Sequence, residues 1–150
     1  MAALDDLYQR VILDHSRSPR NRGPLAGANR SAVGDNPVCG DRITVSLVVD
    51  AAGRIARAGF EGAGCAIATA SASMMTESVA GRTREEAHRL AAHLEAVVSG
   101  RAPPPGDAPE DLAALSGVAR FPVRVKCARL AWRALLAALA DGTGTVSTEQ

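Results

Sequence analysis

The centre of the chain reads Arg42-Ile-Thr-Val-Ser-Leu-Val-Val-Asp-Ala-Ala-Gly-Arg-Ile-Ala-Arg-Ala-Gly-Phe-Glu61. From Ile43 to Val49, apolar residues alternate with mostly polar ones, which is the period of a half-buried β-strand. The segment Asp50-Ala-Ala-Gly53 is typical of a hairpin turn, so residues 54–61 are predicted to return antiparallel to the first strand. A further short strand is predicted over residues 29–34. These patterns indicate a small antiparallel sheet.

Helical patterns lie on both sides of this hairpin. Amphipathic spacing, capping residues and terminal glycines predict helices at about residues 4–15, 65–80, 83–99 and 122–141. The third of these begins with a capping box, Thr83 with Glu86 three residues later. Pro122 is suited to the first turn of the fourth. Strands and helices together predict an α+β fold.

The composition favours one ordinary domain. The 150 residues are 47% hydrophobic and 22% charged, as in globular proteins. The net charge of +1 argues against a charge-driven binder of nucleic acid or anionic membranes, and no apolar run approaches a membrane span in length. The acidic N-terminal segment is unlike a signal peptide. We therefore expect a cytoplasmic protein with one domain over residues 1–142, a flexible tail over 143–150, and neither nucleic acid nor membrane as partner.

Three cysteines, an odd number, are available for metal or sulfur chemistry. Cys39 and Asp41 are two residues apart, so in an extended chain both side chains face the same side and can reach one ion. Cys65 heads a predicted helix, and Cys127 lies in the first turns of another. These four donors would complete a tetrahedral zinc site, in which thiolates bind at about 2.3 Å and carboxylate oxygens at about 2.0–2.2 Å.

The spacing of the cysteines leaves a second interpretation open. The chain has no Cys-x-x-Cys pair, and scattered cysteines are often small core residues. The helix dipole at Cys65, and the positive charges of Arg124 and Lys126 beside Cys127, favour thiolates instead. Arg124 either steadies a thiolate through a charge-assisted hydrogen bond or is a plain surface residue.

Other polar and sulfur-containing residues have simpler interpretations. His15, near a helix end, is either a ligand or partner contact or a residue that interacts with the helix dipole. Met74 and Met75 are expected in the core, whereas His88 and His93 are expected in solvent.

Several blocks of the sequence resemble a known family. They are, in chain order, Asp14-His15, Ser18-Pro-Arg-Asn-Arg-Gly23, Asn36-Pro-Val-Cys-Gly-Asp-Arg42, Phe60-Glu-Gly-Ala-Gly-Cys65, Ala70-Ser-Ala-Ser-Met-Met-Thr-Glu77 and Phe121-Pro-Val-Arg-Val-Lys-Cys127. From about residue 7 to 139 the chain is similar to the SufU branch of the IscU-type iron–sulfur assembly proteins.

Three departures from the IscU scaffold branch favour the SufU branch. The scaffolds carry histidine at the position of Lys126, and a Leu-Pro-Pro-Val-Lys-like motif where this chain reads Phe121-Pro-Val-Arg-Val-Lys126. The proline-rich segment 101–111 lies between Cys65 and Cys127 and is similar to the SufU insertion.

The resemblance implies a fold and a site. The fold is a three-stranded antiparallel sheet packed against about five helices, as in SufE and IscU. The site is one zinc ion per chain, held by Cys39, Asp41, Cys65 and Cys127.

The resemblance also implies partners. The first is a SufS-type, pyridoxal-phosphate-dependent cysteine desulfurase, which this chain would activate as a zinc-dependent sulfurtransferase. Cys39 would accept persulfide sulfur, a histidine of the partner would take its place at the zinc, and the sulfur would pass to a downstream iron–sulfur scaffold or other acceptor.

Two other functions stay open at this point. One is a scaffold on which an iron–sulfur cluster is assembled by the same four side chains. The other is a zinc-stabilised interaction module without sulfur chemistry. The ammonium of Lys126 has no lone pair for a metal, so we expect it outside the coordination shell, where its charge offsets that of the donors. This arrangement favours a closed zinc centre over a cluster.

Overall fold

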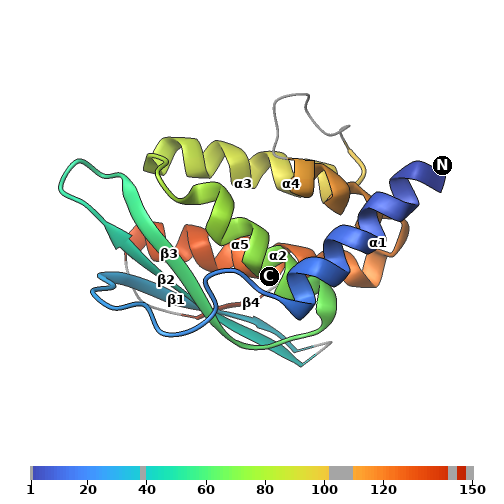
Figure 1. Cartoon of the computed structure of the whole chain (residues 1–150). Helices are drawn as coiled ribbons and strands as arrows, with labels where there is room; N and C mark the ends of the chain where they lie inside the picture. Colours follow the sequence, from blue (N-terminus) through green and yellow to red (C-terminus); the bar gives the residue numbers. More distant parts are fainter. Residues whose placement is uncertain (1, 38–39, 102–109, 142–144, 148–150) are drawn as a thin grey trace.

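A single sheet carries helices packed against it in the computed structural model, which describes residues 2–37, 40–101, 110–141 and 145–147 (Figure 1). The strands are β1 (Arg30–Asn36), β2 (Asp41–Val49), β3 (Ile55–Ala63) and β4 (Thr145–Ser147), in the spatial order β3-β2-β1-β4. β2 pairs antiparallel with both β1 and β3. The predicted α+β fold with its three antiparallel strands is confirmed.

The central strand β2 shows the alternation that its sequence predicts. Ile43, Val45 and Leu47 are fully buried, while the residues between them are half-buried. The register with β1 places Asn36 directly beside Asp41. Gly62 on β3 has a φ of +121°, and a Cβ there would collide with the backbone carbonyl of Arg42. A glycine is therefore needed for β3 to run close to the start of β2.

The sheet has one strand more than expected. Residues Thr145–Ser147, which the sequence analysis assigns to a flexible tail, run parallel to β1 opposite residues 33–35. Three residues are too few for a strand pattern to stand out in a sequence. The outer edge of β1 supplies the hydrogen-bonding groups that fix them in an extended conformation.

The helices of the described residues follow the predicted positions closely. They are α1 (Ala2–Arg17), α2 (Ala66–Val79), α3 (Arg84–Val98), α4 (Glu110–Ala114) and α5 (Pro122–Asp141), with a 3₁₀ turn over Leu115–Arg120. The capping box of Thr83 and Glu86 is present at the start of α3. The short α4 and the 3₁₀ turn were not predicted, and residues 102–109 of the proline-rich segment lie outside the described residues.

The core lies between the sheet and the helices α2 and α5 (Figure 1). Met74 and Met75 on α2 are buried in it, as expected, whereas His88 and His93 are exposed. Ser71 on α2 donates to the Ala128 carbonyl at 2.6 Å and accepts from Trp132 Nε1 at 3.1 Å. These bonds fix α2, which Cys65 caps, against α5, which contains Cys127.

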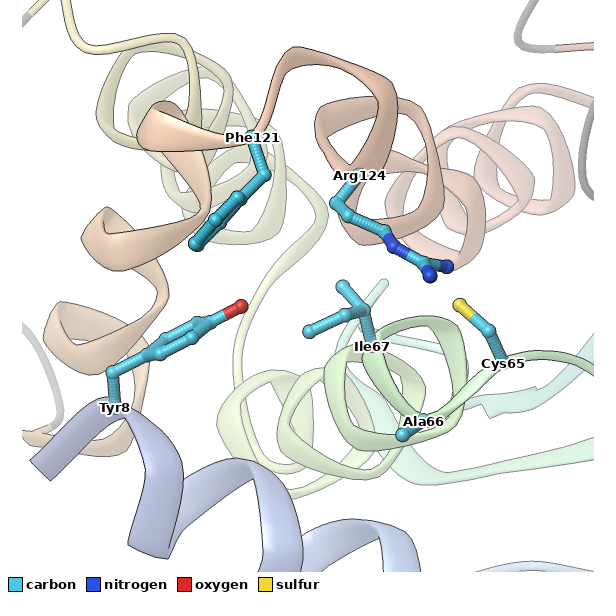
Figure 2. A pocket seen from close by; sticks show the side chains of 6 residues that line it. All are labelled: Tyr8, Cys65, Ala66, Ile67, Phe121 and Arg124. Carbon is cyan, nitrogen blue, oxygen red and sulfur yellow. The ribbon is translucent and has the colours of Figure 1, made fainter. Parts of the chain in front are cut away.

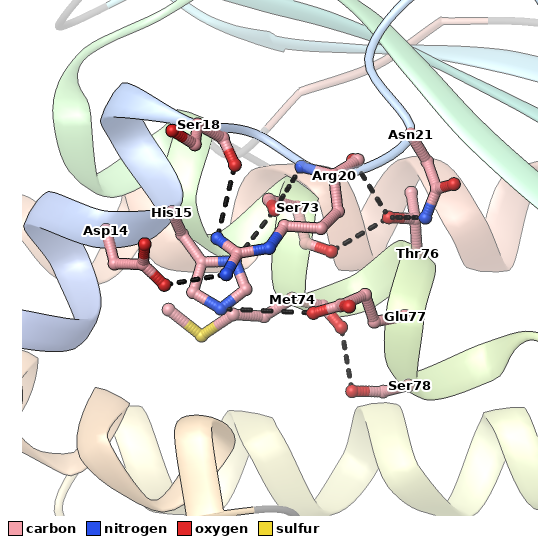
Figure 3. A network of polar contacts seen from close by, with 10 residues as sticks. All are labelled: Asp14, His15, Ser18, Arg20, Asn21, Ser73, Met74, Thr76, Glu77 and Ser78. Atoms are coloured by element: carbon pink, nitrogen blue, oxygen red, sulfur yellow. Dashed lines mark hydrogen bonds and ion pairs between the residues drawn. The ribbon is translucent and has the colours of Figure 1, made fainter.

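His15 takes part in a polar network that joins α1 to α2 (Figure 3). It is fully buried, with Nδ1 2.7 Å from Ser73 Oγ and Nε2 4.0 Å from Glu77 Oε1. Ser73 Oγ also accepts the Arg20 backbone N–H at 2.8 Å, so its own hydrogen can be donated to Nδ1. His15 bonds to the neighbouring helix, because the loop after α1 folds back over α2.

No helix among the described residues is both long and apolar enough to cross a lipid bilayer.

Candidate metal centre

Three side chains with metal-binding atoms converge where β2, α2 and α5 meet. The ligand atoms of Asp41, Cys65 and Cys127 all lie within 4.8 Å of one another. Asp41 is 2% exposed, Cys127 is fully buried and Cys65 is half-buried. The residues come from positions 41, 65 and 127, so the fold brings together donors that are far apart in the sequence.

Each donor is held at the end of a regular element. Asp41 is the first residue of β2, and its Oδ1 accepts the Cys65 backbone N–H at 2.9 Å. Cys65 is the N-cap of α2, and its sulfur accepts the Ala68 N–H at 3.5 Å. Cys127 lies in the second turn of α5, among buried core residues. The site therefore depends on the packing of a strand and two helices rather than on a local motif.

The donor set fits a divalent, borderline-soft metal such as zinc. Cys65 Sγ lies 3.9 Å from Asp41 Oδ2. Two donors at tetrahedral zinc distances would be about 3.5–3.8 Å apart, so a small contraction would let both contact one ion. Two thiols and a carboxylate leave one tetrahedral position to be filled from elsewhere in the chain or from outside it. These three residues could hold a metal ion.

Cys65 has the electronic character of a metal-binding or nucleophilic thiol. A hydrogen bond with the Cys127 side chain, aided by the backbone N–H groups of Ala68 and Ile67, lowers the pKa of Cys65 to about 6. Burial and the nearby charge of Asp41 oppose this shift. Without a metal, Cys65 is therefore mostly a thiolate at neutral pH.

An open pocket of about 330 Å³ lies on the outer side of Cys65 (Figure 2). Its lining includes Tyr8, Ile67 and Phe121, and the rings of Tyr8 and Phe121 are stacked with centroids 6.5 Å apart. In Figure 2, the Arg124 guanidinium reaches from α5 toward the sulfur of Cys65. Burial raises the pKa of Tyr8, so its hydroxyl stays protonated at neutral pH. The thiolate thus borders a pocket with an apolar wall and one cation.

The structure places several of the predicted site residues close together. Asp41, Cys65 and Cys127 lie together, and Arg124 lines the pocket beside Cys65. Lys126 is half-buried next to Cys127 in the sequence. Cys39 lies outside the described residues, between the described ends at Pro37 and Gly40.

The sequence analysis did not identify Asn36 or the aromatic pair Tyr8 and Phe121. Asn36 is fully buried, with its Nδ2 facing both Asp41 and Cys127. A signal was available, because Ala32, Gly34 and Asn36 are the alternate residues of β1 that are buried. The stacked ring pair joins residues 8 and 121, and no local pattern reveals such a contact.

Comparison with known proteins places this arrangement in a family. A family model described as the NifU-like N-terminal domain matches residues 7–147. The chain is 43% identical over 146 residues to the zinc-dependent sulfurtransferase SufU of Bacillus subtilis, covering 95% of this chain and 96% of that protein. It is 40% identical over 139 residues to the iron–sulfur cluster assembly scaffold protein IscU of Streptococcus pyogenes, covering 93% and 86%.

A solved structure agrees with these matches. The crystal structure of FiSufU from Fervidobacterium islandicum AW-1, described as an assembly scaffold for the SUF system, superposes with a TM-score of 0.81. The two sequences are 32% identical, and the match covers 89% of this chain and 96% of the other. Sequence motifs, fold and relatives all agree. The chain belongs to the family of NifU-like N-terminal domains and is of the SufU/IscU type.

Proposed function

We propose that this chain is a zinc-containing, sulfur-accepting protein of iron–sulfur cluster assembly that activates a SufS-type cysteine desulfurase and relays persulfide sulfur through Cys39. The observation that carries the proposal is the convergence of the ligand atoms of Asp41, Cys65 and Cys127 within 4.8 Å. Cys39 precedes Asp41 by two residues in the sequence. The name of the Bacillus subtilis relative, a zinc-dependent sulfurtransferase, supports it. Cys39 would be the fourth ligand of one zinc ion per chain.

The proposed transfer is a thiol–disulfide-type exchange. The Cys39 thiolate attacks the terminal sulfur of the persulfide on the partner's cysteine. A new sulfur–sulfur bond forms on Cys39 while the old one breaks, and the partner's cysteine leaves as a thiolate. One sulfane sulfur moves without any net oxidation or reduction. A second attack, by a thiolate of a downstream scaffold or other acceptor, returns Cys39 to its starting form.

The chain's own residues suit this exchange. A bound zinc ion would keep the thiolate ligands deprotonated and shielded from other reactions. Arg124 places a positive charge beside Cys65, which would help balance the negative charge of the donors. Lys126 would act in the same way from outside the coordination shell. These thiols require a reducing compartment, for which we propose the cytoplasm.

A surface beside the centre is suited to contact with the partner enzyme. Phe121 and Val123, at the start of α5, are 46% and 62% exposed. They lie within three residues of Arg124 in the sequence. Exposed apolar side chains bordered by a cation are typical of a protein interface.

The test is turnover of a SufS-type desulfurase with and without this protein. We expect stimulation by the parent protein and none by Cys39→Ser, measured as alanine released from cysteine. Cys39→Ser should keep the far-ultraviolet circular dichroism spectrum of the parent. If Cys39→Ser stimulates as well as the parent while Cys127→Ser does not, the acceptor is a different thiol. If the parent fails to stimulate, the sulfurtransferase function is wrong.

A cluster scaffold is the second candidate, favoured by the relatives named as IscU scaffolds. The same four side chains would then hold an iron–sulfur cluster. Anaerobic incubation of the zinc-loaded protein with ferrous iron and sulfide separates the two functions. We expect little stable cluster. A stoichiometric two-iron cluster identified by Mössbauer spectroscopy, formed with loss of zinc, would favour the scaffold.

A further inference from the structure

Asn36 lies beside two of the three candidate donors, Asp41 and Cys127. It is the last residue of β1 and is fully buried. Its Nδ2 lies 3.5 Å from Asp41 Oδ2 and 3.7 Å from Cys127 Sγ. One amide nitrogen, which carries two hydrogens, thus faces one donor on β2 and another on α5.

Folding alone does not explain this side chain. Burying an amide is costly unless its hydrogen bonds are satisfied. Asn36 Oδ1 is buried and has no hydrogen-bond partner among the described residues. The two bonds of Nδ2 are long, so they offset little of the cost. An alanine in this strand position would avoid the cost, as Ala32 does four residues earlier on the same buried face of β1.

The orientation of the amide follows from charge. With Nδ2 inward, its hydrogens point at a carboxylate and a sulfur, both of which are negative when they hold a metal. The reversed amide would set the Asn36 carbonyl oxygen against Asp41 Oδ2 and Cys127 Sγ, which is repulsive. Asn36 is therefore suited to the anionic form of the donors, the form that a cation selects.

We propose that Asn36 is a positioning residue of the metal centre, whose amide clamps Asp41 to Cys127 and keeps these two donors in place while Cys39 is engaged in sulfur transfer. This inference rests on the zinc centre of the proposed function. Residues that hydrogen-bond to metal ligands orient them, and their loss weakens metal binding by about 10–100-fold. We expect a loss of that size in zinc retention when the Asn36 amide is removed.

The test compares Asn36→Ala and Asn36→Leu with the parent. Alanine removes the amide, and leucine replaces it with an apolar side chain of similar volume, so that a cavity is not confused with a lost donor. Two measurements are made: the rate of zinc transfer to a coloured chelator, and the absorption spectrum of the cobalt(II) form. Removing an N–H···S bond raises the energy of the sulfur lone pair. The thiolate-to-cobalt band of both variants should therefore move to longer wavelength.

Asn29→Ala is the matched control. Asn29 precedes the same strand at its opposite end, where its side chain bonds the backbone of Val49 through both Nδ2 and Oδ1. Its loss should lower the melting temperature but leave zinc transfer and the cobalt band unchanged. Asn36→Ala should speed up zinc transfer and shift the cobalt band. In the metal-free protein, its melting temperature should be equal to or above that of the parent.

The outcomes separate this inference from the proposed function. A parent protein without a tetrahedral cobalt spectrum overturns the metal centre itself. A parent with that spectrum, but with unchanged zinc transfer and cobalt band in both Asn36 variants, overturns the clamp alone. Faster zinc transfer in Asn29→Ala equal to that in Asn36→Ala would show general loosening, and that too overturns the clamp.

Discussion

The two carboxylate oxygens of Asp41 have different partners. Oδ1 accepts the backbone N–H of Cys65, which ties the start of β2 to the start of α2. Oδ2 faces the sulfur of Cys65 and the amide of Asn36. One oxygen thus contributes to the fold, and the other is available to a metal.

This division predicts different results for two substitutions of Asp41. Asp41→Asn can keep the bond to the Cys65 N–H but removes the charge, whereas Asp41→Ala loses both. Both variants should stay folded and retain zinc at least about tenfold less well than the parent, since even outer-shell changes have effects of that size. Asp41→Ala should also lose about 1–3 kcal/mol of stability, because the Cys65 N–H is left without its acceptor.

Elemental analysis and urea unfolding of the two variants provide the measurements. Full zinc content in Asp41→Ala would remove Asp41 from the ligand set. Equal stability of the two variants would show that Oδ1 does not link β2 to α2.

The lowered pKa of Cys65 predicts a pH dependence in the metal-free protein. The thiol titrates near pH 6 when folded, against an ordinary value of 9.0. Its thiolate therefore stabilises the fold fully above about pH 9, and this contribution is lost as the pH falls to about 6. Alkylation of Cys65 by iodoacetamide, followed by peptide mass spectrometry, should show a midpoint near pH 6.

The hydrogen bond with Cys127 is the largest cause of this shift. Cys127→Ala should therefore move the alkylation midpoint upward. A midpoint that stays in place in this variant would assign the effect to the helix N-terminus instead.

Polar contacts join α2 to two other helices. Its N-terminus is capped by the sulfur of Cys65, and its middle bonds to α5 through Ser71 and to α1 through Ser73. A helix with small polar residues packs closely on its neighbours, and the buried hydroxyls of Ser71, Ser73 and Thr76 each have a partner. Displacement of α2 would move Cys65, so these contacts hold the candidate centre in place.

Ser73→Ala should destabilise the protein by about 1–3 kcal/mol in urea unfolding, because His15 Nδ1 and the Arg20 N–H both lose a partner inside the protein. Ser78→Ala is the control on the same helix. Its hydroxyl bonds only the Met74 carbonyl one turn earlier among the described contacts, so the change should stay within about 0.5 kcal/mol. Equal effects of the two substitutions would contradict an α1–α2 link through Ser73.

Elements with a strong local pattern could be predicted from the sequence. The alternation in β2, the turn at Asp50–Gly53 and the capping box of α3 each depend on neighbouring residues. The short α4 and the 3₁₀ turn depend on tertiary packing, since Leu112, Leu115 and Val118 are buried against other parts of the chain. A five-residue helix has too few turns to show a period.

The same distinction applies to the candidate site. Asp41, Cys65 and Cys127 could be identified because their side chains have metal-binding chemistry and lie at element boundaries. Asn36 could not be identified in this way, because the role that we propose for it depends on the register that sets it beside Asp41. The contact between Tyr8 and Phe121 requires α1 to pack beside the end of the 3₁₀ turn, which residue spacing does not reveal.

At the scale of the whole molecule, the candidate centre lies at one end of the sheet–helix body, where the start of β2 meets the N-terminal turns of α2 and α5. Gly117 allows α1 to approach this end, because a Cβ there would press against the Tyr8 ring at 2.8 Å. The packing of α1 therefore places Tyr8 in the wall of the pocket that Cys65 also lines.

Strand β4 has a consequence for how the protein behaves in solution. Its three residues occupy the outer side of β1 next to residues 33–35. A chain ending after residue 142 would leave the backbone N–H and C=O groups on this side of residues 33–35 without β4. An unpaired strand edge is a template for pairing with another molecule. We expect the shortened chain to self-associate with rising concentration in light-scattering measurements, and Val33→Lys to suppress this by placing a charge on the edge. A shortened chain that stays monomeric would contradict this expectation. If the shortened chain self-associates as expected, residues 145–147 act in the full chain as a built-in guard against aggregation.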